Sequence, residues 1–447
     1  MSGASAFQET IDQLDLLHQQ PIVPASVAGL RRIEFLLERL GNPHRSFHAV
    51  HITGSSGKGS TTAMVGSMLQ VAGFRTGYFR SPHLFSYTER IAVDDLDIAP
   101  DAWVSYFDQL WPVVEDMRQG RLPACDLGRP SHGEVLFALM ALHFQSSGVE
   151  WAAVEVGLGG RLDATNALSA DVAVITNVSL EHTHILGDTT EAIAAEKAAI
   201  IKSGSTAVTA ADDPGALMVI EERARQLRIP LIRVDHEVHV QVLATSDVGQ
   251  VLRLTYGRES IDASLSVAGT FQARNAATAF AVGQALLRRG VTLSPGAIHD
   301  GLERTRIPGR FEVVQRKPTV IVDGAHNPAA ALALRESLDL ILPNRRVILL
   351  FAAMADKNTP EMARELGPRS RRVIVTRAPD APRAADPALL AEQFRSYSDT
   401  VLAIESPDTA LAAALNLQRG DDVLLIAGSL YLVGWARNVW TSREVGV

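Results

Sequence analysis

Short apolar runs alternate with longer amphipathic segments through most of the chain, which is the pattern of βαβ units on a parallel sheet. The clearest unit has a strand at residues 48–53, a glycine-rich turn, and a helix at 60–72 that ends at Gly73. Apolar runs without alternation are typical of strands that are buried on both faces. Such strands are expected at residues 76–79, 151–156 and 172–176, with helices at 102–118, 133–145 and 191–202.

The pattern changes between residues 237 and 267, where Val238, Val240 and Val242 alternate with polar residues. Alternation of this kind predicts a small antiparallel patch in place of another βαβ unit. A helix is expected next, at residues 272–289, and the segment 305–310 then reads as a link between domains.

A second α/β series follows this link. Its strands are expected at residues 319–322, 347–351, 373–376 and 423–427, and its helices at 328–340, 387–396 and 408–417. The chain is therefore predicted to be α/β with two domains of ordinary size. Residues 1–304 form a large domain with a mostly parallel sheet, and residues 305–447 form a smaller Rossmann-like α/β domain.

Composition and charge exclude several classes of protein. The chain has 447 residues, is 47% hydrophobic, and carries a formal net charge of −8, which gives no general attraction to nucleic acid or anionic membrane. Its single cysteine, Cys125, excludes an internal disulfide framework and a cysteine-based zinc site, and fits a reducing compartment. The segment 1–20 lacks the apolar core of a signal peptide, and no apolar run approaches the roughly 20 residues of a membrane span. We expect a cytoplasmic enzyme.

The first candidate site is the turn Gly54-Ser55-Ser56-Gly57-Lys58-Gly59-Ser60. A strand, a glycine-rich turn and a helix in this order direct backbone N–H groups and a helix N-terminus at anionic oxygens, and Lys58 adds a charge for the terminal phosphates of a nucleotide. The spacing is not that of an ordinary Walker loop, because Ile52 stands where its first glycine would fall and Gly59 separates the lysine from Ser60. The alternative is a flexible turn with a solvated lysine.

Glu155 ends the apolar run at 151–156. A carboxylate that is buried there must be paired, protonated or bound to a cation. Ligands of open α/β sheets bind at the carboxyl ends of the strands, where this residue would lie. A role in binding magnesium is therefore reasonable, and an ion pair with Arg161 is the structural alternative.

Two further groups of polar residues follow predicted strands. His182 and His184 come after the run at 172–176, where a loop histidine is more often a surface residue than a ligand. The segment Asp323–Pro328 ends a strand and opens a helix in the second domain. Its final Asn-Pro pair suits a helix cap, which leaves Asp323 and His326 to be explained by function.

Lys197 lies in the helix expected at 191–202 and would share a face with Ile193, Ile200 and Ile201. A lysine on an apolar face must extend its ammonium to solvent, pair with an acid, or lose its charge. From the sequence alone, extension to solvent is the favoured outcome.

Taken together, these residues resemble the folylpolyglutamate synthase/dihydrofolate synthase family, which is of the Mur-ligase type of ATP-dependent amide ligases. The matching segments are in order from about residue 28 to residue 434 and span nearly the whole chain. They are the phosphate loop with Gly59 after its lysine, Ser81–Leu84 with Tyr87–Arg90, Glu155–Asn166, Glu181–Thr183, Glu196–Ala198, Asn275–Ala279, Pro308–Arg310, Asp323–Pro328 and Gly428–Ser429. The loop reads Gly-Ser-Ser-Gly where the family commonly has Gly-Thr-Asn-Gly.

The resemblance implies a function for each matching residue. It implies an ATP site made by Ser55, Ser56, Gly57, Lys58, Gly59, Ser60, Asn275, Arg310 and Asp323. It implies two magnesium ions, one held by Ser81, Glu155 and His182 and a second by a carbamylated Lys197, with a monovalent cation as a further candidate. It implies a dihydropteroate site lined by Ser131, His132, Gly133, Glu134, Leu162, Asp163 and Ala164, and a glutamate site near His326 and Ser429. The catalytic roles would be carried by Lys58, Lys197 and His326.

The activity that the resemblance implies is ligation of L-glutamate to dihydropteroate and to reduced folates through an acyl phosphate, by a monomer. One alternative is a member of the family with one of the two activities. A cell-wall Mur ligase is a second, but too few residues precede the first strand for its extra N-terminal domain. A regulatory nucleotide-binding module is a third, and it would not need the metal-type residues of both domains.

Overall fold

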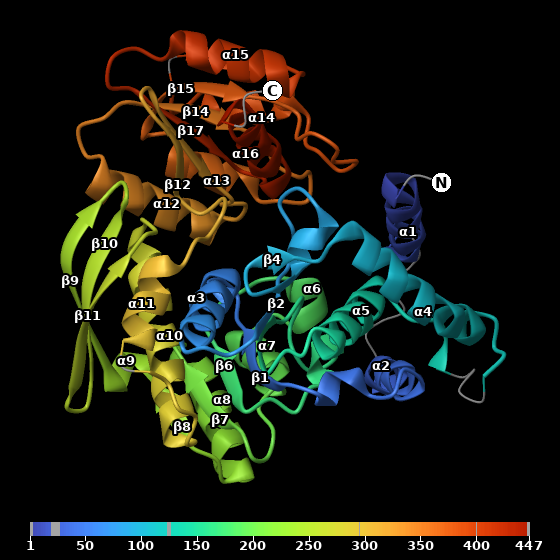
Figure 1. The fold of residues 1–447 in the computed structure, drawn as a ribbon. Helices are drawn as coiled ribbons and strands as arrows, with labels where there is room; N and C mark the ends of the chain where they lie inside the picture. The colour runs from blue at the N-terminus through green and yellow to red at the C-terminus, as the bar shows by residue number, and fades with distance from the viewer. Residues whose placement is uncertain (1–2, 19–26, 123–126, 295, 399, 445–447) are drawn as a thin grey trace. The chain divides into compact units, whose positions relative to one another are not determined.

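The computed structural model describes residues 3–18, 27–122, 127–294, 296–398 and 400–444 (Figure 1). Cys125 lies outside these ranges. The chain forms two compact units. The last segment of the first unit ends at Arg304, and the last segment of the second begins at Thr305. The first unit comprises Met1–Gln241, Arg253–Ala263 and Arg274–Arg304, and the second comprises Val242–Leu252, Ser264–Ala273 and Thr305–Val447.

The first unit is built on an eight-stranded sheet with the order β4-β3-β2-β5-β1-β6-β7-β8. Its strands are β1 (His48–Thr53), β2 (Thr76–Phe79), β3 (Ile91–Val93), β4 (Leu96–Asp97), β5 (Trp151–Glu155), β6 (Val172–Ile175), β7 (Thr206–Thr209) and β8 (Leu231–Arg233). All neighbours are parallel except β2 with β3 and β3 with β4. Ile52 of β1 is in register with Glu155 and Thr53 with Ile175, so the three central strands end at one edge.

Helices cover this sheet and form two apolar cores. The helices before residue 305 are α1 (Gly3–His18), α2 (Val27–Arg39), α3 (Lys58–Val71), α4 (Pro100–Arg118), α5 (His132–Ser146), α6 (Thr183–Leu186), α7 (Thr190–Ala198), α8 (Pro214–Leu227), α9 (Val234–Glu237), α10 (Thr270–Arg288) and α11 (Ala297–Arg304), with 3₁₀ turns η1 (Pro43–Arg45), η2 (Tyr87–Arg90) and η4 (Ala164–Ala167). One core gathers side chains of α1, α2, α4 and α5, and the other gathers those of α7 and α8.

Helix α3 packs closely against α11. Gly301 of α11 lies so near the backbone of α3 that a Cβ at this position would be 2.5 Å from the Cα of Met68. The hydroxyl of Ser67 donates a hydrogen bond of 2.7 Å to the Gly301 carbonyl. This approach, which only glycine permits, fixes the helix whose first turn follows the phosphate loop.

A three-stranded sheet with the order β11-β10-β9 follows α9. Its strands are β9 (Val238–Ser246), β10 (Gly249–Tyr256) and β11 (Glu259–Leu265). Because two-residue connections join successive strands that are neighbours, the strands are antiparallel hairpins, as the alternation of valines predicts.

The second unit has a six-stranded sheet with the order β12-β13-β17-β14-β15-β16, in which only β12 and β13 pair in antiparallel fashion. Its strands are β12 (Glu312–Arg316), β13 (Thr319–Asp323), β14 (Val347–Phe351), β15 (Ser370–Val375), β16 (Thr400–Ala403) and β17 (Val423–Ala427). Its helices are α12 (Pro328–Ile341), α13 (Thr359–Leu366), α14 (Pro387–Phe394), α15 (Pro407–Leu417) and α16 (Leu430–Glu444). Asp323 is in register with Ala427, so β13 and β17 end side by side.

The prediction of an α/β chain with two mostly parallel sheets is confirmed. The helix expected at 191–202 is wrong at its end, because α7 stops at Ala198. The N–H groups of Ile200 and Ile201 then donate to the carbonyls of Lys197 and Ala198 (3.2 and 3.0 Å), three positions earlier in each case, and both isoleucines remain in the core. In the part of the chain that the structure describes, no helix is long and apolar enough to cross a membrane.

Candidate functional site

The turn between β1 and α3 leaves the first turn of α3 accessible to an anion. Gly57 caps α3 with a φ of 80°, and Lys58 is the first helical residue. Gly54 has a φ of 151°, and a Cβ there would overlap the hydroxyl of Thr176 at 1.8 Å. Both positions therefore require glycine, which keeps the backbone N–H groups of the first turn of α3 accessible.

The serines of the turn hold it to the segment that follows β6. The Ser55 hydroxyl accepts from the N–H of Ser179 at 3.0 Å and donates to the carbonyl of Ser179 at 3.1 Å. Asn177 donates its amide to the Ser56 hydroxyl at 2.9 Å and accepts from the Ser56 N–H at 2.7 Å. Both residues thus position the loop. Their contact with a nucleotide stays a prediction, and Gly57 to Ser60 are the better placed of the predicted residues.

Lys58 and Asn275 lie against this loop. The Lys58 ammonium donates to the Gly54 carbonyl at 2.6 Å, so it is folded back over the turn. Asn275 of α10 is 7% exposed, and a Cβ on Gly57 would lie 2.4 Å from its Oδ1. Asn275 therefore lies beside the phosphate loop, although it is more than 200 positions later in the sequence.

Glu155 is buried beside the first turn of α3. It is 3% exposed at the end of β5, and its Oε2 accepts from the N–H of Ser81 at 3.0 Å. A Cβ on Gly59 would be 3.5 Å from the same oxygen. The alternative of an ion pair with Arg161 is wrong, because that guanidinium binds Glu196 at 2.8 Å. A buried carboxylate next to a phosphate loop suits a hard cation such as magnesium.

Lys197 is 1% exposed, so the expectation that its ammonium reaches solvent is wrong. The ammonium pairs with Glu181 at 2.7 Å. Burial lowers the pKa of Lys197, Glu181 opposes this effect, and the charge of Lys58 lowers the pKa further. Glu181 was not singled out as a site residue, although it adjoins His182 in the sequence.

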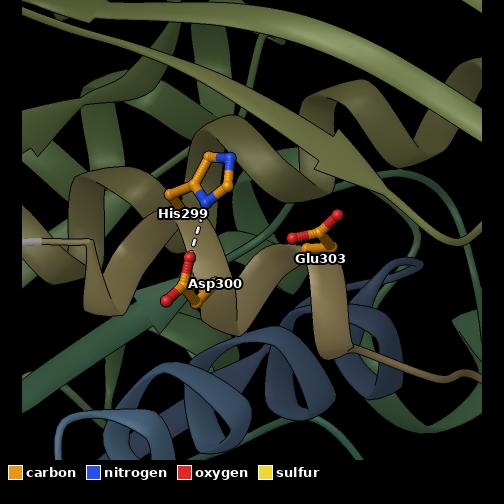
Figure 2. Close-up of side chains that lie close together, drawn as sticks. All are labelled: His299, Asp300 and Glu303. Atoms are coloured by element: carbon orange, nitrogen blue, oxygen red, sulfur yellow. Dashed lines mark hydrogen bonds and ion pairs between the residues drawn. The ribbon is translucent and has the colours of Figure 1, made fainter.

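His182 caps the short helix α6 in a left-handed conformation, with a φ of 45°, and is exposed. Among the residues that the structure describes, neither His182 nor Glu155 belongs to a group of three His, Cys, Asp or Glu side chains close enough to share a metal ion. Within the described ranges the group that meets this test is His299, Asp300 and Glu303 on α11, whose ligand atoms lie within 4.8 Å (Figure 2). Magnesium usually takes one or two carboxylates together with substrate phosphates and water, so it does not require such a group.

Residues predicted to line a dihydropteroate site begin α5. Ser131 caps this helix in a capping box with Glu134, whose carboxylate also binds Arg32 at 2.8 Å. The Tyr87 hydroxyl lies 3.3 Å from Nε2 of His132. A Cβ on Gly133 would meet nothing within 4 Å. Ser131 and Glu134 therefore shape the helix start, and His132 and Gly133 are the members of this group that can face a ligand.

The other predicted substrate residues, Leu162 to Ala164, precede η4. Asp163 caps that turn and accepts from the N–H groups of Thr165 and Leu158, both at 3.0 Å. Burial raises the pKa of Asp163, and these hydrogen bonds oppose the shift. Asp163 thus ties together the two ends of the glycine-rich loop that follows Glu155. Leu162 and Ala164 are its neighbours in the sequence.

A buried histidine that the sequence did not single out supports this loop. His51 of β1 is fully buried, and its Nε2 lies 2.8 Å from the Thr165 hydroxyl. That hydroxyl donates its one proton to Asp163 at 2.5 Å, so Nε2 must be the donor toward Thr165. Nδ1 has no hydrogen-bond partner among the described residues. Burial first, and then the charge of Lys202, lower the pKa of His51 to about 3.

The segment from Ser81 to Arg90 is organised by a carboxylate that was part of a matched motif but not a predicted site residue. Glu89 accepts from the N–H groups of Leu84, Phe85 and Ser86 at 2.8, 2.9 and 2.8 Å. The side chain of Phe85 is left 65% exposed. This segment directly follows β2, beside Glu155.

In the second unit, Asp323 ends β13 and is 3% exposed. Its carboxylate accepts from the N–H groups of Phe311 at 2.7 Å and Ala325 at 2.8 Å. Burial raises the pKa of Asp323, and the charge of Arg310 opposes the shift. A Cβ on Gly324 would lie 1.9 Å from the Arg310 guanidinium, so the glycine makes room for it.

His326 and Ser429 lie at the same edge of this sheet. The Nδ1 of His326 is 2.8 Å from the Gly324 carbonyl, which can only accept, so Nδ1 carries the proton. Ser429 is 3% exposed and follows β17, and its hydroxyl accepts from the N–H of Tyr431 at 3.2 Å. The Gly428 N–H donates to the Ala325 carbonyl at 3.0 Å, which joins the two strand ends. Arg310, Asp323, His326 and Ser429 therefore gather at this edge.

Models of known protein families match segments in both units of the chain. A model described as the Mur ligase middle domain matches residues 130–283, and one described as the Mur ligase glutamate ligase domain matches residues 309–430. The dihydrofolate synthase/folylpolyglutamate synthase of Bacillus subtilis is 33% identical over 410 residues, which cover 91% of this chain and 93% of that protein. The folylpolyglutamate synthase of Lacticaseibacillus casei is 32% identical over 418 residues, with 92% and 94% covered.

Solved structures are similar over nearly the full length. FolC of Escherichia coli, in complex with DHPP and ADP, has a TM-score of 0.85 at 29% identity, and the match covers 99% of this chain and 100% of that one. The bifunctional folylpolyglutamate synthase/dihydrofolate synthase of Yersinia pestis, complexed with AMPPNP and a Mn ion, has a TM-score of 0.82 at 28% identity, and the match covers 97% of this chain and 98% of that one.

Replacing His51 by Gln should flatten the dependence of stability on pH. The unfolded chain binds a proton on this side chain near pH 6.5 and the folded chain only near pH 3, so proton uptake favours unfolding between these values. Relative to His51→Gln, the wild type should lose up to about 1.4 kcal/mol of unfolding free energy per pH unit as the pH falls through this window.

Urea denaturation of both proteins at about pH 7 and about pH 5 measures the difference. His239→Gln, which removes an exposed imidazole on β9, should behave as the wild type does. Equal losses for the wild type and His51→Gln would show that His51 is not held neutral.

Proposed function

Because the chain belongs to the folylpolyglutamate synthase/dihydrofolate synthase family of ATP-dependent Mur-type amide ligases, we propose that it joins L-glutamate to dihydropteroate and also to reduced folates. The observation that carries this proposal is the convergence of Glu155, Lys197 and the loop before Lys58 at one edge of the first sheet. The bifunctional name of the B. subtilis relative supports two activities, and that of the L. casei relative leaves one activity as the alternative.

We assign the nucleotide to the phosphate loop. The N–H groups of Gly57 to Ser60 and the Lys58 ammonium would bind the β- and γ-phosphates of ATP. Asn275, Arg310 and Asp323 would bind the rest of the nucleotide. The Lys58 charge offsets the charge that develops on the transferring phosphoryl group.

We assign a magnesium ion to Ser81, Glu155 and His182. The Y. pestis enzyme is complexed with AMPPNP and a Mn ion, which supports a divalent metal as a partner of the nucleotide in this chain. When bound, the metal would neutralise charge on the phosphates of the nucleotide. Glu155 fits this role because it is buried beside the phosphate loop and Arg161 does not neutralise it.

The reaction we propose has two covalent steps. A carboxylate oxygen of the pteroate or folate substrate attacks the γ-phosphorus of ATP, and ADP leaves, which gives an acyl phosphate. The amino nitrogen of L-glutamate then attacks the acyl carbon, phosphate leaves with its bonding electrons, and the nitrogen loses a proton to give the amide. His326 and Ser429 would position the incoming glutamate, and His132, Gly133, Leu162 and Ala164 would contact the pteroate. The E. coli relative is in complex with DHPP, which supports a substrate of this class.

We further propose that Lys197 is carbamylated in the active enzyme. Burial lowers the pKa of this ammonium and so raises the share of neutral amine that can attack CO₂. An N–C bond forms, the nitrogen loses a proton, and a cation becomes a carboxylate-like anion. This group would provide a ligand for a second magnesium ion.

Phosphate release tests the function directly. With ATP, magnesium and L-glutamate present, we expect release with dihydropteroate and, separately, with tetrahydrofolate, and little without either. Release with one acceptor alone would reduce the proposal to a single activity, and no release with either would contradict it. A muramyl peptide precursor provides the negative control.

Glu155→Gln should lower kcat by about 100-fold or more, or about 2.7 kcal/mol in activation free energy, because the amide is a poor magnesium ligand. The variant should also need more magnesium for half-maximal activity. Glu222→Gln, on the exposed face of α8, is the matched control and should keep wild-type kinetics. Near-normal turnover of Glu155→Gln, with an unchanged magnesium requirement, would exclude the metal role.

Lys197→Ala should be inactive and should regain part of its activity in acetate or formate, since a small carboxylate can occupy the space of the lost carbamate. Lys202→Ala is the control. Lys202 is also partly buried and has a lowered pKa, but it holds the Leu168 carbonyl at 2.8 Å, so carboxylates should not restore any loss it causes. Equal responses of the two variants to acetate would contradict a carbamate at Lys197.

A further inference from the structure

A cavity of about 380 Å³ lies in the second unit, away from the residues assigned above. It is found where β14 and β15 begin, and four of the residues that line it are Arg345, Arg346, Arg369 and Arg371. Asp323 ends β13 and Ser429 follows β17, so both lie at the carboxyl ends of parallel strands of the same sheet. The cavity therefore occupies the opposite edge.

Two of the four arginines are explained by the fold. Arg369 binds Asp339 at 3.0 Å and the Arg345 carbonyl at 2.6 Å, and it also donates to the Leu342 carbonyl just after α12. Arg345 donates to the carbonyl of Asp421 at 2.6 Å and to the hydroxyl of Thr319 at 3.0 Å. These bonds satisfy backbone groups at the ends of elements and fix both guanidinium groups in place.

The other two arginines have no such role. Arg346 and Arg371 are exposed, and neither guanidinium makes a hydrogen bond or ion pair with any residue in the ranges that the structure describes. Both positions are nonetheless defined by the backbone. The Arg346 carbonyl accepts from the N–H of Val423 at 2.8 Å, and the Arg371 carbonyl accepts from the hydroxyl of Ser398 at 2.9 Å.

A β-bulge adds Arg371 to the cavity that Arg346 also lines. Val347 is in register with Ser370 and Ile348 with Arg372, so Arg371 is an extra residue on β15. Bulges redirect a side chain and occur often beside functional sites. The extra residue adds an unpaired guanidinium to a cavity that already has three.

We infer that this cavity binds a small oligoanion, a polyphosphate or a polycarboxylate. Its volume falls in the range of small-molecule sites and exceeds the space that one phosphate needs. Planar guanidinium groups bind phosphate and carboxylate oxygens in pairs, and the two fixed arginines supply preorganised charge. Among the residues that the structure describes, the Asp339 carboxylate on Arg369 is the one acidic side chain that pairs with any of these four arginines, in a chain whose net charge is −8.

Calorimetric titration of the full chain with tripolyphosphate and, separately, with citrate tests this site. Arg346→Gln with Arg371→Gln should weaken binding by about tenfold or more, because two charge-assisted pairs are lost. Lys58→Ala should keep the part of the binding that the double Gln variant loses, which separates this site from any binding of tripolyphosphate at the phosphate loop. Arg39→Gln with Arg258→Gln removes two exposed charges elsewhere and should stay within about twofold of the wild type, since distant surface charges are screened.

The two anions distinguish the sources of the ligand, since binding of only one assigns the site to phosphates or to carboxylates. Arg346→Lys with Arg371→Lys, which keeps the charge without the planar fork, should bind with intermediate affinity. Unchanged binding in the double Gln variant, or no binding of either anion to Lys58→Ala, would overturn the inference. The outcome does not depend on the ligase assignment, because no step of the ligase reaction is assayed.

Discussion

The register of three parallel strands is the constraint on which the first unit depends. Ile52 pairs with Glu155 and Thr53 with Ile175, so β5, β1 and β6 end together. Because side chains and loops leave the sheet at these ends, the phosphate loop and a buried carboxylate meet there, and the segment after β6 reaches the loop through Asn177. A shift of one residue in β5 would turn Glu155 to the other face of the sheet.

Burial of charge at this edge connects stability with function. Glu155 and Lys197 are 3% and 1% exposed, and the cost of burying either charge must be offset by a partner. The Lys197 ammonium pairs with Glu181, and the Glu155 carboxylate accepts from the N–H of Ser81 close to the first turn of α3. Removal of charge from solvent also strengthens interactions with a phosphate or a cation that binds there. The buried charges of Glu155 and Lys197, which cost folding free energy, are thus the groups that a ligase needs to bind phosphate and metal.

The second unit uses the two edges of its sheet differently. At the carboxyl ends, Asp323 and Ser429 are almost fully buried and bonded to backbone N–H groups, as in a preorganised site. At the amino ends, arginines satisfy carbonyls that follow helices, and the bulge adds Arg371, whose guanidinium has no partner within the described part of the chain. The contrast follows from the direction of the chain, because parallel strands place all loops of one kind at one edge.

The sequence by itself determined the α/β class, most strand positions and the position of the phosphate loop, since these depend on local apolar patterns and on glycines that the turn requires. It also indicated the acid at Glu155, because that residue ends an apolar run. Tertiary structure decided which partners the charged groups take. Lys197 was expected to reach solvent, but Glu181, sixteen residues earlier in the chain, lies 2.7 Å from it in the fold.

The same limit applies to His51 and Arg371, which no local pattern distinguishes. His51 looks like any polar residue in a strand until Thr165, 114 positions later, closes over it. The position of Arg371 depends on the register of β14 against β15, which neither strand determines alone. Hydrogen bonds and ion pairs form between groups that the fold brings close, so a single sequence shows which groups need partners but not which partners they find.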